Sequence, residues 1–246
     1  MRVDNHPNAN AIKRLRAKTA EVNRRLIARF GRPTWRGPEH PLQSLIRTIL
    51  TQNTNDVLSE RAYRSLRKSF PRWEMLLDAP TARIASAIRV GGLANQKSRN
   101  IKDFLRWVQA AYGRMSLDSL CDMSVDEAVE MLRPHRGIGL KTIYVTLMFA
   151  CGKDVFPVDT HIYRIVRRLA LAPEKASRDG VTHAMQPLVP KGYALPLHLN
   201  LIRFGREVCS ARNPRCYDCP LVRLCRYPSK NLTRAPGAPA ARRPGL

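Results

Sequence analysis

Residues 132–150 read Leu-Arg-Pro-His-Arg-Gly-Ile-Gly-Leu-Lys-Thr-Ile-Tyr-Val-Thr-Leu-Met-Phe-Ala. Gly137 and Gly139 interrupt a pattern that is otherwise helical, and glycine lets a backbone turn tightly or approach a partner closely. Helix, Gly-x-Gly turn and apolar helix together are typical of a helix-hairpin-helix, in which amide groups at the start of the second helix face a phosphate. A simple Gly-rich connection between two helices is the alternative. By itself, Lys141 predicts only a solvated cation or a phosphate contact.

The rest of the chain has the same helical character. Apolar residues recur at helical spacing near residues 42–50, 84–88, 98–112, 124–132, 160–171 and 197–206. Pro and Gly residues separate these segments, and the sequence contains no alternating pattern long enough to predict a strand. We therefore predict an all-α protein of about ten helices.

The composition indicates an anionic partner. The 246 residues include 43 Lys and Arg against 19 Asp and Glu, which gives a net charge of +24. With 44% hydrophobic residues the chain can build a sizeable core, and no apolar run reaches the roughly 20 residues of a membrane span. Nucleic acid is the first candidate for such a partner, and an anionic membrane surface is the second.

The charge is spread unevenly. Residues 1–36 hold ten basic and two acidic residues (+8), residues 37–225 hold 28 and 17 (+11), and residues 226–246 hold five and none (+5). Apolar residues between Ile12 and Ile27 have helical spacing and predict a basic amphipathic helix of the folded protein, with an organelle presequence as the alternative. The Pro, Ala and Arg content of residues 229–246 predicts a disordered basic tail.

Four of the six cysteines lie in one short stretch with the spacing C-x6-C-x2-C-x5-C: Cys209, Cys216, Cys219 and Cys225. Four thiolates so close in sequence can bind an iron–sulfur cluster or zinc. Zinc ribbons usually use two C-x2-C pairs, whereas here one pair is flanked by single cysteines, so the spacing favours iron–sulfur. Zinc and disulfides remain alternatives. Cys121 and Cys151 lie elsewhere, and we predict that both are small buried hydrophobic residues.

Val158-Asp-Thr-His161 precedes a helical stripe of apolar residues that begins at Ile162. The local sequence predicts Asp159 as the N-cap of this helix, because a short acidic side chain accepts from free backbone N–H groups there. A capping carboxylate is held rigidly and can still face a cleft, so the cap is compatible with a chemical role.

In their order along the chain, these segments resemble the endonuclease III family of DNA base-excision glycosylases. The resemblance runs from about Arg29 to Cys225. It rests on Ile-Leu-Thr-Gln-Asn-Thr-Asn-Asp at 49–56, Gly-Gly-Leu-Ala-Asn-Gln-Lys-Ser-Arg-Asn-Ile at 91–101, Gly-Ile-Gly-Leu-Lys-Thr at 137–142, Val-Asp-Thr-His at 158–161 and the four cysteines.

The resemblance implies two helical domains with the active site in the groove between them. A six-helix barrel that contains the helix-hairpin-helix would span residues 34–153. An iron–sulfur domain would combine residues 1–33 with residues 154–228. Its [4Fe-4S] cluster would be bound by Cys209, Cys216, Cys219 and Cys225.

The resemblance also implies a bifunctional DNA-repair enzyme, a glycosylase with AP lyase activity. A damaged base, expected to be an oxidised pyrimidine, would first be extruded from the duplex. Lys141 Nζ would attack the sugar C1′, displace the base and form a Schiff base that permits β-elimination. Asp159 would stabilise positive charge at the sugar and assist proton transfer. An ordinary lysine has a pKa of about 10.4, so the site must favour the neutral amine.

The remaining predicted site residues contact DNA. Leu93 would wedge into the base stack, and either Gln52 or Asn53 would fill the space that the extruded base leaves. The other predicted contacts are Gly137, Gly139, Thr142 and His161. The expected partner is double-stranded DNA with damaged bases or abasic sites, without a membrane partner. We expect a monomer, located in the cytoplasm with the nucleoid if the source is a prokaryote.

Several residues bear on which damaged base the protein would remove. Residues 42–55 contain no Asp or Glu and include Arg47, which argues against the adenine-removing branch, because that branch uses an acid there. His135-Arg136 stand where the family usually has Leu-Pro, and Ile143-Tyr144 stand where a small residue is common. Bulk beside Lys141 predicts a narrower pocket or another favoured lesion. A glycosylase of this fold for pyrimidine dimers or mismatches, and a non-catalytic binder of DNA structures, are the alternatives.

Overall fold

The computed structural model describes residues 9–233, and every element in that range is a helix. The predicted all-α fold is confirmed, with eleven α-helices and five short 3₁₀ helices among the described residues. Most of the predicted basic tail, residues 234–246, lies outside the described residues, as do residues 1–8. None of the helices in the described range is long and apolar enough to cross a membrane.

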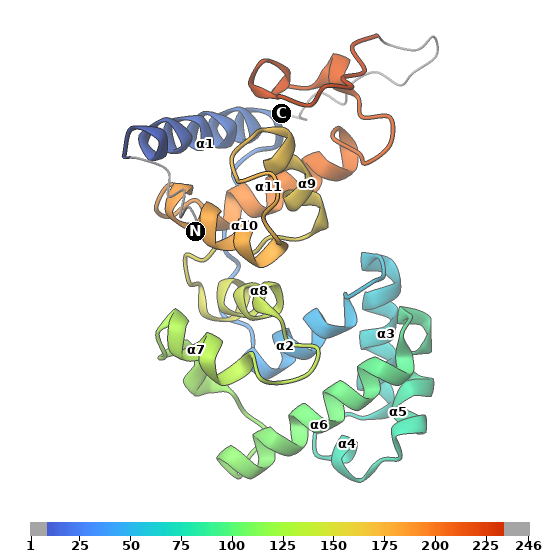
Figure 1. The fold of residues 1–246 in the computed structure, drawn as a ribbon. Coiled ribbons are helices and arrows are strands. Elements are labelled where there is room, and N and C mark those ends of the chain that lie inside the picture. Colours follow the sequence, from blue (N-terminus) through green and yellow to red (C-terminus); the bar gives the residue numbers. More distant parts are fainter. Residues whose placement is uncertain (1–8, 234–246) are drawn as a thin grey trace, which may run out of the picture. The chain divides into compact units, whose positions relative to one another are not determined.

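The chain divides into two compact units (Figure 1). Unit 1 combines Met1–Trp35 with Asp154–Leu246, and unit 2 is the continuous stretch Arg36–Lys153. Unit 1 is therefore discontinuous in sequence, because the chain leaves it after Trp35 and returns at Asp154.

Unit 2 is built on the packing of α2 (Pro41–Leu50) against α8 (Leu140–Cys151). Most side chains of both helices are buried, among them Ile49 in α2 and Leu147 in α8. A helix that is apolar on nearly all sides, as α8 is, is stable only when neighbouring elements cover it. The other helices of this unit are α3 (Asp56–Ser69), α4 (Met75–Asp78), α5 (Thr81–Ala87), η1 (Arg89–Gly91), α6 (Ala94–Tyr112), η2 (Asp118–Cys121) and α7 (Val125–Leu132).

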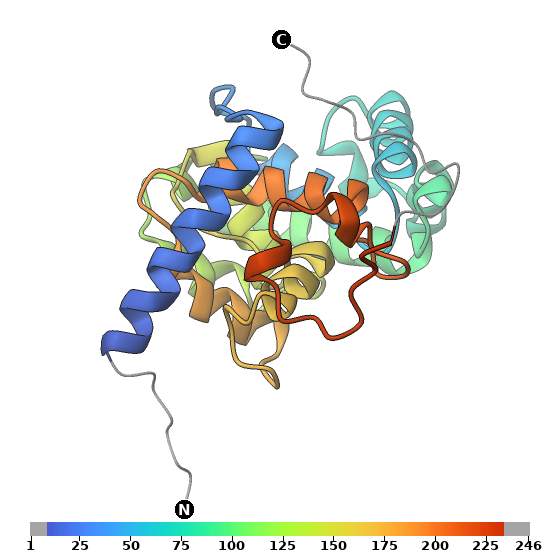
Figure 2. The ribbon, with the colours of Figure 1, turned by 90° about the horizontal axis from the view of Figure 1, so that it is seen from above.

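Unit 1 packs α1 (Ala9–Phe30) and α9 (Thr160–Arg168) against α11 (Ala194–Glu207). The predicted amphipathic helix near the N-terminus is confirmed as α1, with Val22 and Leu26 buried. Figure 2 shows α1 and the segment after α11 on the same side of this unit, and Arg29 of α1 forms an ion pair with Asp218 in that segment at 2.7 Å. The other helices are α10 (Arg178–Met185), η3 (Gln186–Leu188), η4 (Cys216–Asp218) and η5 (Val222–Leu224).

Cys121 and Cys151 form a disulfide in unit 2, so the prediction of two small buried hydrophobic residues is wrong. Cys121 ends η2 and Cys151 ends α8, and the bond ties the last turn of α8 to the segment before α7. The two residues are 30 positions apart and each is only half-buried. No motif surrounds either residue, so the pairing depends on how α8 and η2 pack.

Candidate functional site

The predicted helix-hairpin-helix is confirmed in unit 2 as α7, a turn and α8 (Figure 1). Gly137 lies in the turn with φ +80°, a left-handed conformation that favours glycine. Gly139 is the N-cap of α8, and the first turn of that helix has no capping side chain. Its backbone N–H groups are therefore available to an anion, as at other helix N-termini that bind phosphate.

Gly137 is fixed by residues from two other helices. Gln52, just past the end of α2, donates from Nε2 to the Gly137 carbonyl oxygen at 2.8 Å and to Thr142 Oγ1 at 3.3 Å. Asn100 of α6 lies so close that a Cβ on residue 137 would come within 2.4 Å of its Nδ2. Glycine is thus required at position 137 because the backbone there is left-handed and because a Cβ would collide with Asn100. The hairpin turn is held by α2 and α6 together.

Two exposed turns lie next to each other in the same unit. Asn53 and Leu93 both have φ +51°, and a Cβ on Gly92 would lie 3.9 Å from the Asn53 carbonyl oxygen. Leu93 is 48% exposed, which is high for a large apolar side chain, and Asn53 is exposed as well. Left-handed backbone in residues other than glycine is uncommon and is concentrated at functional sites.

A buried lysine joins these two turns. Lys97 Nζ donates to the carbonyl oxygens of Leu50 at 2.9 Å and Gly91 at 2.8 Å, and only 2% of Lys97 is exposed. Burial lowers the pKa of Lys97. Leu50 lies two residues before Gln52, and Gly91 lies two residues before Leu93. One ammonium group therefore sets the distance between both turns, a role that the sequence analysis missed.

Lys141 is the second residue of α8 and is half-buried. It shares this partial exposure with Val145 and Phe149, and the spacing of four places all three side chains in one stripe along the helix. Ile143 and Tyr144 are 0% and 6% exposed, so both belong to the core of unit 2. They lie outside the Lys141 stripe, and the bulk expected beside the lysine faces the core instead.

His135 lies in the turn before Gly137 and packs against α6. Its ring centroid is 4.3 Å from that of Trp107, and Phe104 makes an edge contact at 5.2 Å. Burial among these rings lowers the pKa of His135. The histidine therefore fills an aromatic pocket that anchors the turn, which accounts for an uncommon residue at this position.

Two arginines line a hollow of about 490 Å³ beside the hairpin. Arg99 and Arg136 share this hollow with Gln96, Asn100 and Gly137, and both arginines are exposed. Its lining includes no carboxylate. Guanidinium and amide donors around an open hollow suit a phosphate group. Neither arginine was among the predicted DNA contacts.

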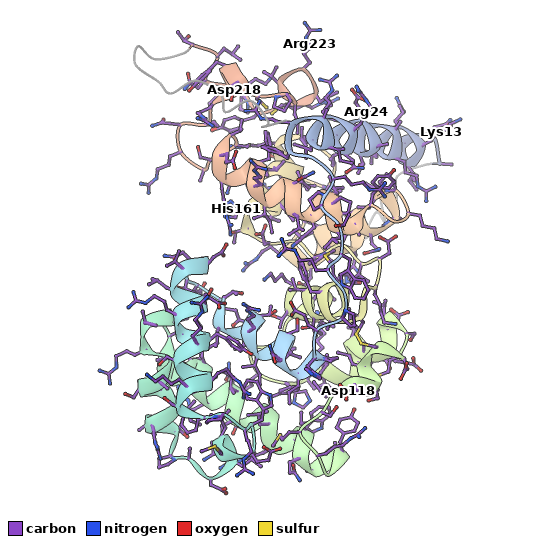
Figure 3. All side chains as sticks on the ribbon, turned by 180° about the vertical axis from the view of Figure 1, so that it is seen from behind. Lys13, Arg24, Asp118, His161, Asp218 and Arg223 are labelled. Carbon is purple, nitrogen blue, oxygen red and sulfur yellow. A yellow bond between two sulfur atoms is a disulfide. The ribbon has the colours of Figure 1, made fainter. Side chains whose placement is uncertain are left out.

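Asp159 and His161 belong to unit 1, at the start of α9. The Asp159 carboxylate accepts from the Ile162 backbone N–H at 2.7 Å, so its prediction as an N-cap is confirmed. His161, labelled in Figure 3, packs on Gly205 of α11, where a Cβ would come within 2.9 Å of the His161 Cβ. Burial is the largest of the effects that lower the pKa of His161.

The four cysteines after α11 line one cavity in unit 1: Cys209, Cys216, Cys219 and Cys225. None of the four forms a disulfide. Burial raises the pKa of the Cys219 thiol to about 12 and also raises the pKa of Cys209. In the described part of the chain, no three His, Cys, Asp or Glu side chains gather closely enough to hold a single metal ion.

Two arginines of α9 contact the first cysteine and were not identified from the sequence. Arg164 donates to the Cys209 carbonyl oxygen at 2.8 Å. Arg168 donates to the Cys209 Sγ at 3.2 Å and to the Ser210 carbonyl oxygen at 2.8 Å. Their spacing of four places both on one face of α9, which is the only sequence signal for this role. The helix that Asp159 caps is therefore also the support of the cysteine segment.

Residues 46–191 match the HhH-GPD superfamily of base excision DNA repair proteins. Endonuclease III of Bacillus subtilis is 31% identical over 191 residues, which cover 78% of this chain and 83% of that protein. The chain belongs to the endonuclease III family. An Arabidopsis thaliana protein named as a candidate DNA glycosylase is 35% identical over 194 residues, covering 75% of this chain and 66% of the plant protein's length.

Solved structures of endonuclease III have the same fold. A non-covalent complex of endonuclease III with DNA is 25% identical, covers 87% of this chain and 95% of that protein, and has a TM-score of 0.71. A trapped covalent intermediate of endonuclease III with DNA covers the same shares at 25% identity, with a TM-score of 0.70. This endonuclease III family member is thus a DNA glycosylase of base excision repair.

Proposed function

We propose that this glycosylase removes an oxidised pyrimidine and then cleaves the abasic site, with Lys141 as the nucleophile. The observation that carries the proposal is the place of Lys141 in the first turn of α8, directly after the turn that Gln52 and Asn100 fix. The endonuclease III that was trapped covalently on DNA supports a covalent step for a relative of this fold.

The chemistry follows from an amine at that position. Lys141 Nζ forms a bond to C1′ while the glycosidic bond breaks, and the base leaves with that bond's electron pair and takes up a proton. The resulting N,O-acetal opens as its C1′–O4′ bond breaks, and O4′ takes up the proton that leaves the amine, which gives the Schiff base. Removal of a proton from C2′ then breaks the C3′–O bond and expels the 3′ phosphate by β-elimination. Only the neutral amine can attack. Lys141 is half-buried and lies at the N-terminal, positive end of α8.

Asp159 is the proposed source of negative charge near the sugar. Its hydrogen bond to the Ile162 N–H holds the carboxylate in a fixed orientation and uses Oδ1. A carboxylate has about four acceptor sites, so the capping bond leaves capacity for a developing cation or a proton in transit. His161 and Thr142 remain proposed DNA contacts.

The four cysteines fit a [4Fe-4S] cluster better than zinc. Zinc ribbons usually use two C-x2-C pairs, whereas here one pair, Cys216 and Cys219, is flanked by single cysteines. All four thiols line one cavity, and all four are free of disulfides. When bound, the cluster would cross-link the segment from Cys209 to Cys225, and Arg223 projects from that segment in Figure 3.

Two features of unit 2 support duplex binding around this site. The first turn of α8 offers backbone N–H groups, and the hollow of Arg99 and Arg136 offers guanidinium groups next to it. We propose that each takes a backbone phosphate. Leu93 is proposed to wedge into the base stack from the neighbouring turn. Asn53, whose side chain is exposed, suits the vacated space better than Gln52, whose amide is bonded to the hairpin.

The test is borohydride trapping on a duplex with one abasic site. The wild-type protein should form a covalent adduct, and Lys141→Gln should form none while still binding the duplex. Lys68→Gln, which changes an exposed lysine in the last turn of α3, serves as the control and should trap normally. An adduct of undiminished yield with Lys141→Gln would overturn the assignment of the nucleophile. The absence of any adduct with wild-type protein would overturn the lyase proposal.

A further inference from the structure

Lys97 of α6 places an ammonium group in the interior of unit 2. Its Nζ donates to the carbonyl oxygens of Leu50 at 2.9 Å and of Gly91 at 2.8 Å, and only 2% of the residue is exposed. Leu50 ends α2, and Gly91 ends η1. The last carbonyl oxygens of a helix have no partner within that helix, so a positive donor is favourable there. A charge is costly to bury, and here two carbonyl oxygens compensate for the lost water.

The two carbonyl groups lead directly into the two turns that carry the proposed DNA contacts. Asn53 follows the first carbonyl by three residues, and Leu93 follows the second by two. The turns are neighbours, because a Cβ on Gly92 would lie 3.9 Å from the Asn53 carbonyl oxygen. The backbone N–H of Lys97 also donates to the Leu93 carbonyl oxygen at 2.9 Å. Lys97 therefore holds the Leu93 turn by backbone and side chain, and the Asn53 turn by its side chain.

Both turns contain backbone that needs support from its surroundings. Asn53 and Leu93 each have φ +51°, and a left-handed conformation in residues other than glycine persists only where neighbouring contacts hold it. Their own side chains supply little of that support, because Leu93 is 48% exposed and Asn53 is exposed as well. Lys97 bonds to the backbone at the inner side of both turns. It therefore leaves the two side chains free to meet DNA.

We propose that Lys97 is a positioning residue for base extrusion, because it joins the two turns so that Leu93 and Asn53 enter the duplex as one unit. Extrusion costs the stacking and pairing of the base. A wedge keeps the stack open only if a second group fills the vacated space, and that group can enter only when the stack is open. Each side chain therefore depends on the other, provided that the distance between their turns is fixed.

This inference rests on the proposed roles of Leu93 and Asn53 and adds a residue that is itself too buried to contact DNA. It has a signature that a purely structural role lacks. Substitutions at independent positions have effects on a rate that multiply, whereas substitutions within one unit have a combined effect far smaller than the product. The Leu93 and Asn53 effects should therefore be coupled when Lys97 is present and independent when it is replaced.

The test measures single-turnover removal of 5-hydroxyuracil opposite guanine by wild-type protein, Asn53→Gly, Leu93→Ala and the double variant. Fluorescence of 2-aminopurine next to the lesion reports opening of the stack independently of the chemistry. The same four proteins are then made with Lys97→Met, which has a similar length and no N–H donor, and with Lys97→Gln, which is shorter and uncharged. Circular dichroism and urea unfolding establish that each variant is folded.

Lys102→Met is the matched control on the same helix. Lys102 is also buried, at 7% exposed, and its Nζ donates to the Ala79 carbonyl oxygen at the end of α4. Its replacement removes a buried ammonium group from unit 2, as Lys97→Met does, but touches neither of the two turns. Any effect of a lost buried lysine on stability alone should therefore appear in both variants.

With Lys97 present, the double variant should be slower than the slower single variant by no more than about twofold. With Lys97→Met or Lys97→Gln, the two effects should multiply to within about twofold, whereas Lys102→Met should keep the coupling. Effects that multiply when Lys97 is present, or coupling that survives its replacement, overturn this inference alone.

Other outcomes concern the proposed function. If neither Asn53→Gly nor Leu93→Ala slows base removal or stack opening, the proposed roles of these two residues are wrong, and the inference about Lys97 is overturned with them. If wild-type protein removes no 5-hydroxyuracil, the proposed oxidised-pyrimidine function is overturned. The 2-aminopurine signal then still shows whether the two turns open the stack as one unit.

Discussion

The side-chain amide of Gln52 donates to the carbonyl oxygen of Gly137 at 2.8 Å, which ties the end of α2 to the turn that precedes Lys141. Gln52 and its neighbour Asn53 were interchangeable candidates for filling the space left by an extruded base. The hydrogen bond separates them, because an amide that holds the hairpin has a structural task, whereas Asn53 is exposed in a turn at φ +51°.

We therefore expect Gln52→Ala to affect mainly stability and Asn53→Gly to affect mainly base removal. Loss of the Gln52 amide leaves the Gly137 carbonyl without its partner and should lower the free energy of unfolding by about 1–2 kcal/mol. Asn53→Gly keeps the left-handed backbone available and should change stability by less than about 0.5 kcal/mol, yet slow base removal. Urea unfolding and single-turnover excision measure the two effects. A stable, slow Gln52→Ala together with a fully active Asn53→Gly would reverse the assignment.

Asp159 caps α9 and is also the proposed negative charge near the sugar. Substitution by asparagine tests these two roles separately. Asparagine caps a helix about as well as aspartate, so Asp159→Asn should unfold within about 0.5 kcal/mol of wild-type protein, whereas Asp159→Ala should lose about 1 kcal/mol. Both variants lack the carboxylate, and we expect base removal to fall by about a hundredfold or more in each. Normal excision by the stable Asp159→Asn would show that the residue acts only as a cap.

Arg99 and Arg136 provide a test of the proposed phosphate site. The double variant Arg99→Gln/Arg136→Gln should weaken duplex binding and reduce the slope of log K against log salt by about 1.8, because each lost phosphate contact contributes about 0.9. Arg106→Gln, on the same helix but paired with Asp103, is the control and should leave the slope unchanged. Binding is measured by fluorescence anisotropy at several salt concentrations. An unaltered slope in the double variant would mean that the hollow holds no phosphate.

The Cys121–Cys151 disulfide should stabilise unit 2. Closure of a loop of about 30 residues is worth up to roughly 3.7 kcal/mol in the chain-entropy treatment of disulfides. Cys121→Ser/Cys151→Ser should therefore unfold at lower urea concentration by an amount up to that limit, and the wild-type protein should show the same loss after reduction. Mass spectrometry after alkylation without reductant should find these two thiols unmodified. Alkylation of both in the native protein would contradict the disulfide.

The sequence was sufficient for features that depend on local pattern. Helical spacing predicted the all-α fold, the glycines predicted the hairpin, and Asp159 was identified as a cap because capping involves neighbours three residues away. The family resemblance followed from motifs in a fixed order, and the family match over residues 46–191 confirms it.

Features that join distant segments could not be predicted in this way. Lys97 resembles any helix lysine in sequence, and its contacts with the Leu50 and Gly91 carbonyls exist only because α2 and η1 end at the same place. The same holds for the Cys121–Cys151 pair and for Arg168 at the Cys209 thiol. Each is a contact across the chain, and the local sequence does not identify the partner residue.

His135 leads to a prediction about acid stability. Burial against Trp107 and Phe104 lowers its pKa in the folded state below the ordinary value of about 6.5. The unfolded chain therefore binds more protons in the window between the two pKa values, so the stabilisation is complete above about pH 6.5 and is lost as the pH falls through the folded-state pKa. His135→Leu removes this titration, and its free energy of unfolding should fall less than that of wild-type protein between pH 7.5 and pH 5.5.

His161 has a pKa shifted in the same direction and should leave part of the loss in place, while His183→Gln, at an exposed position of α10, should retain the full loss. Urea unfolding followed by circular dichroism at both pH values gives the comparison, and equal acid losses for wild-type protein and His135→Leu would show that the ring is protonated at no cost in the folded state.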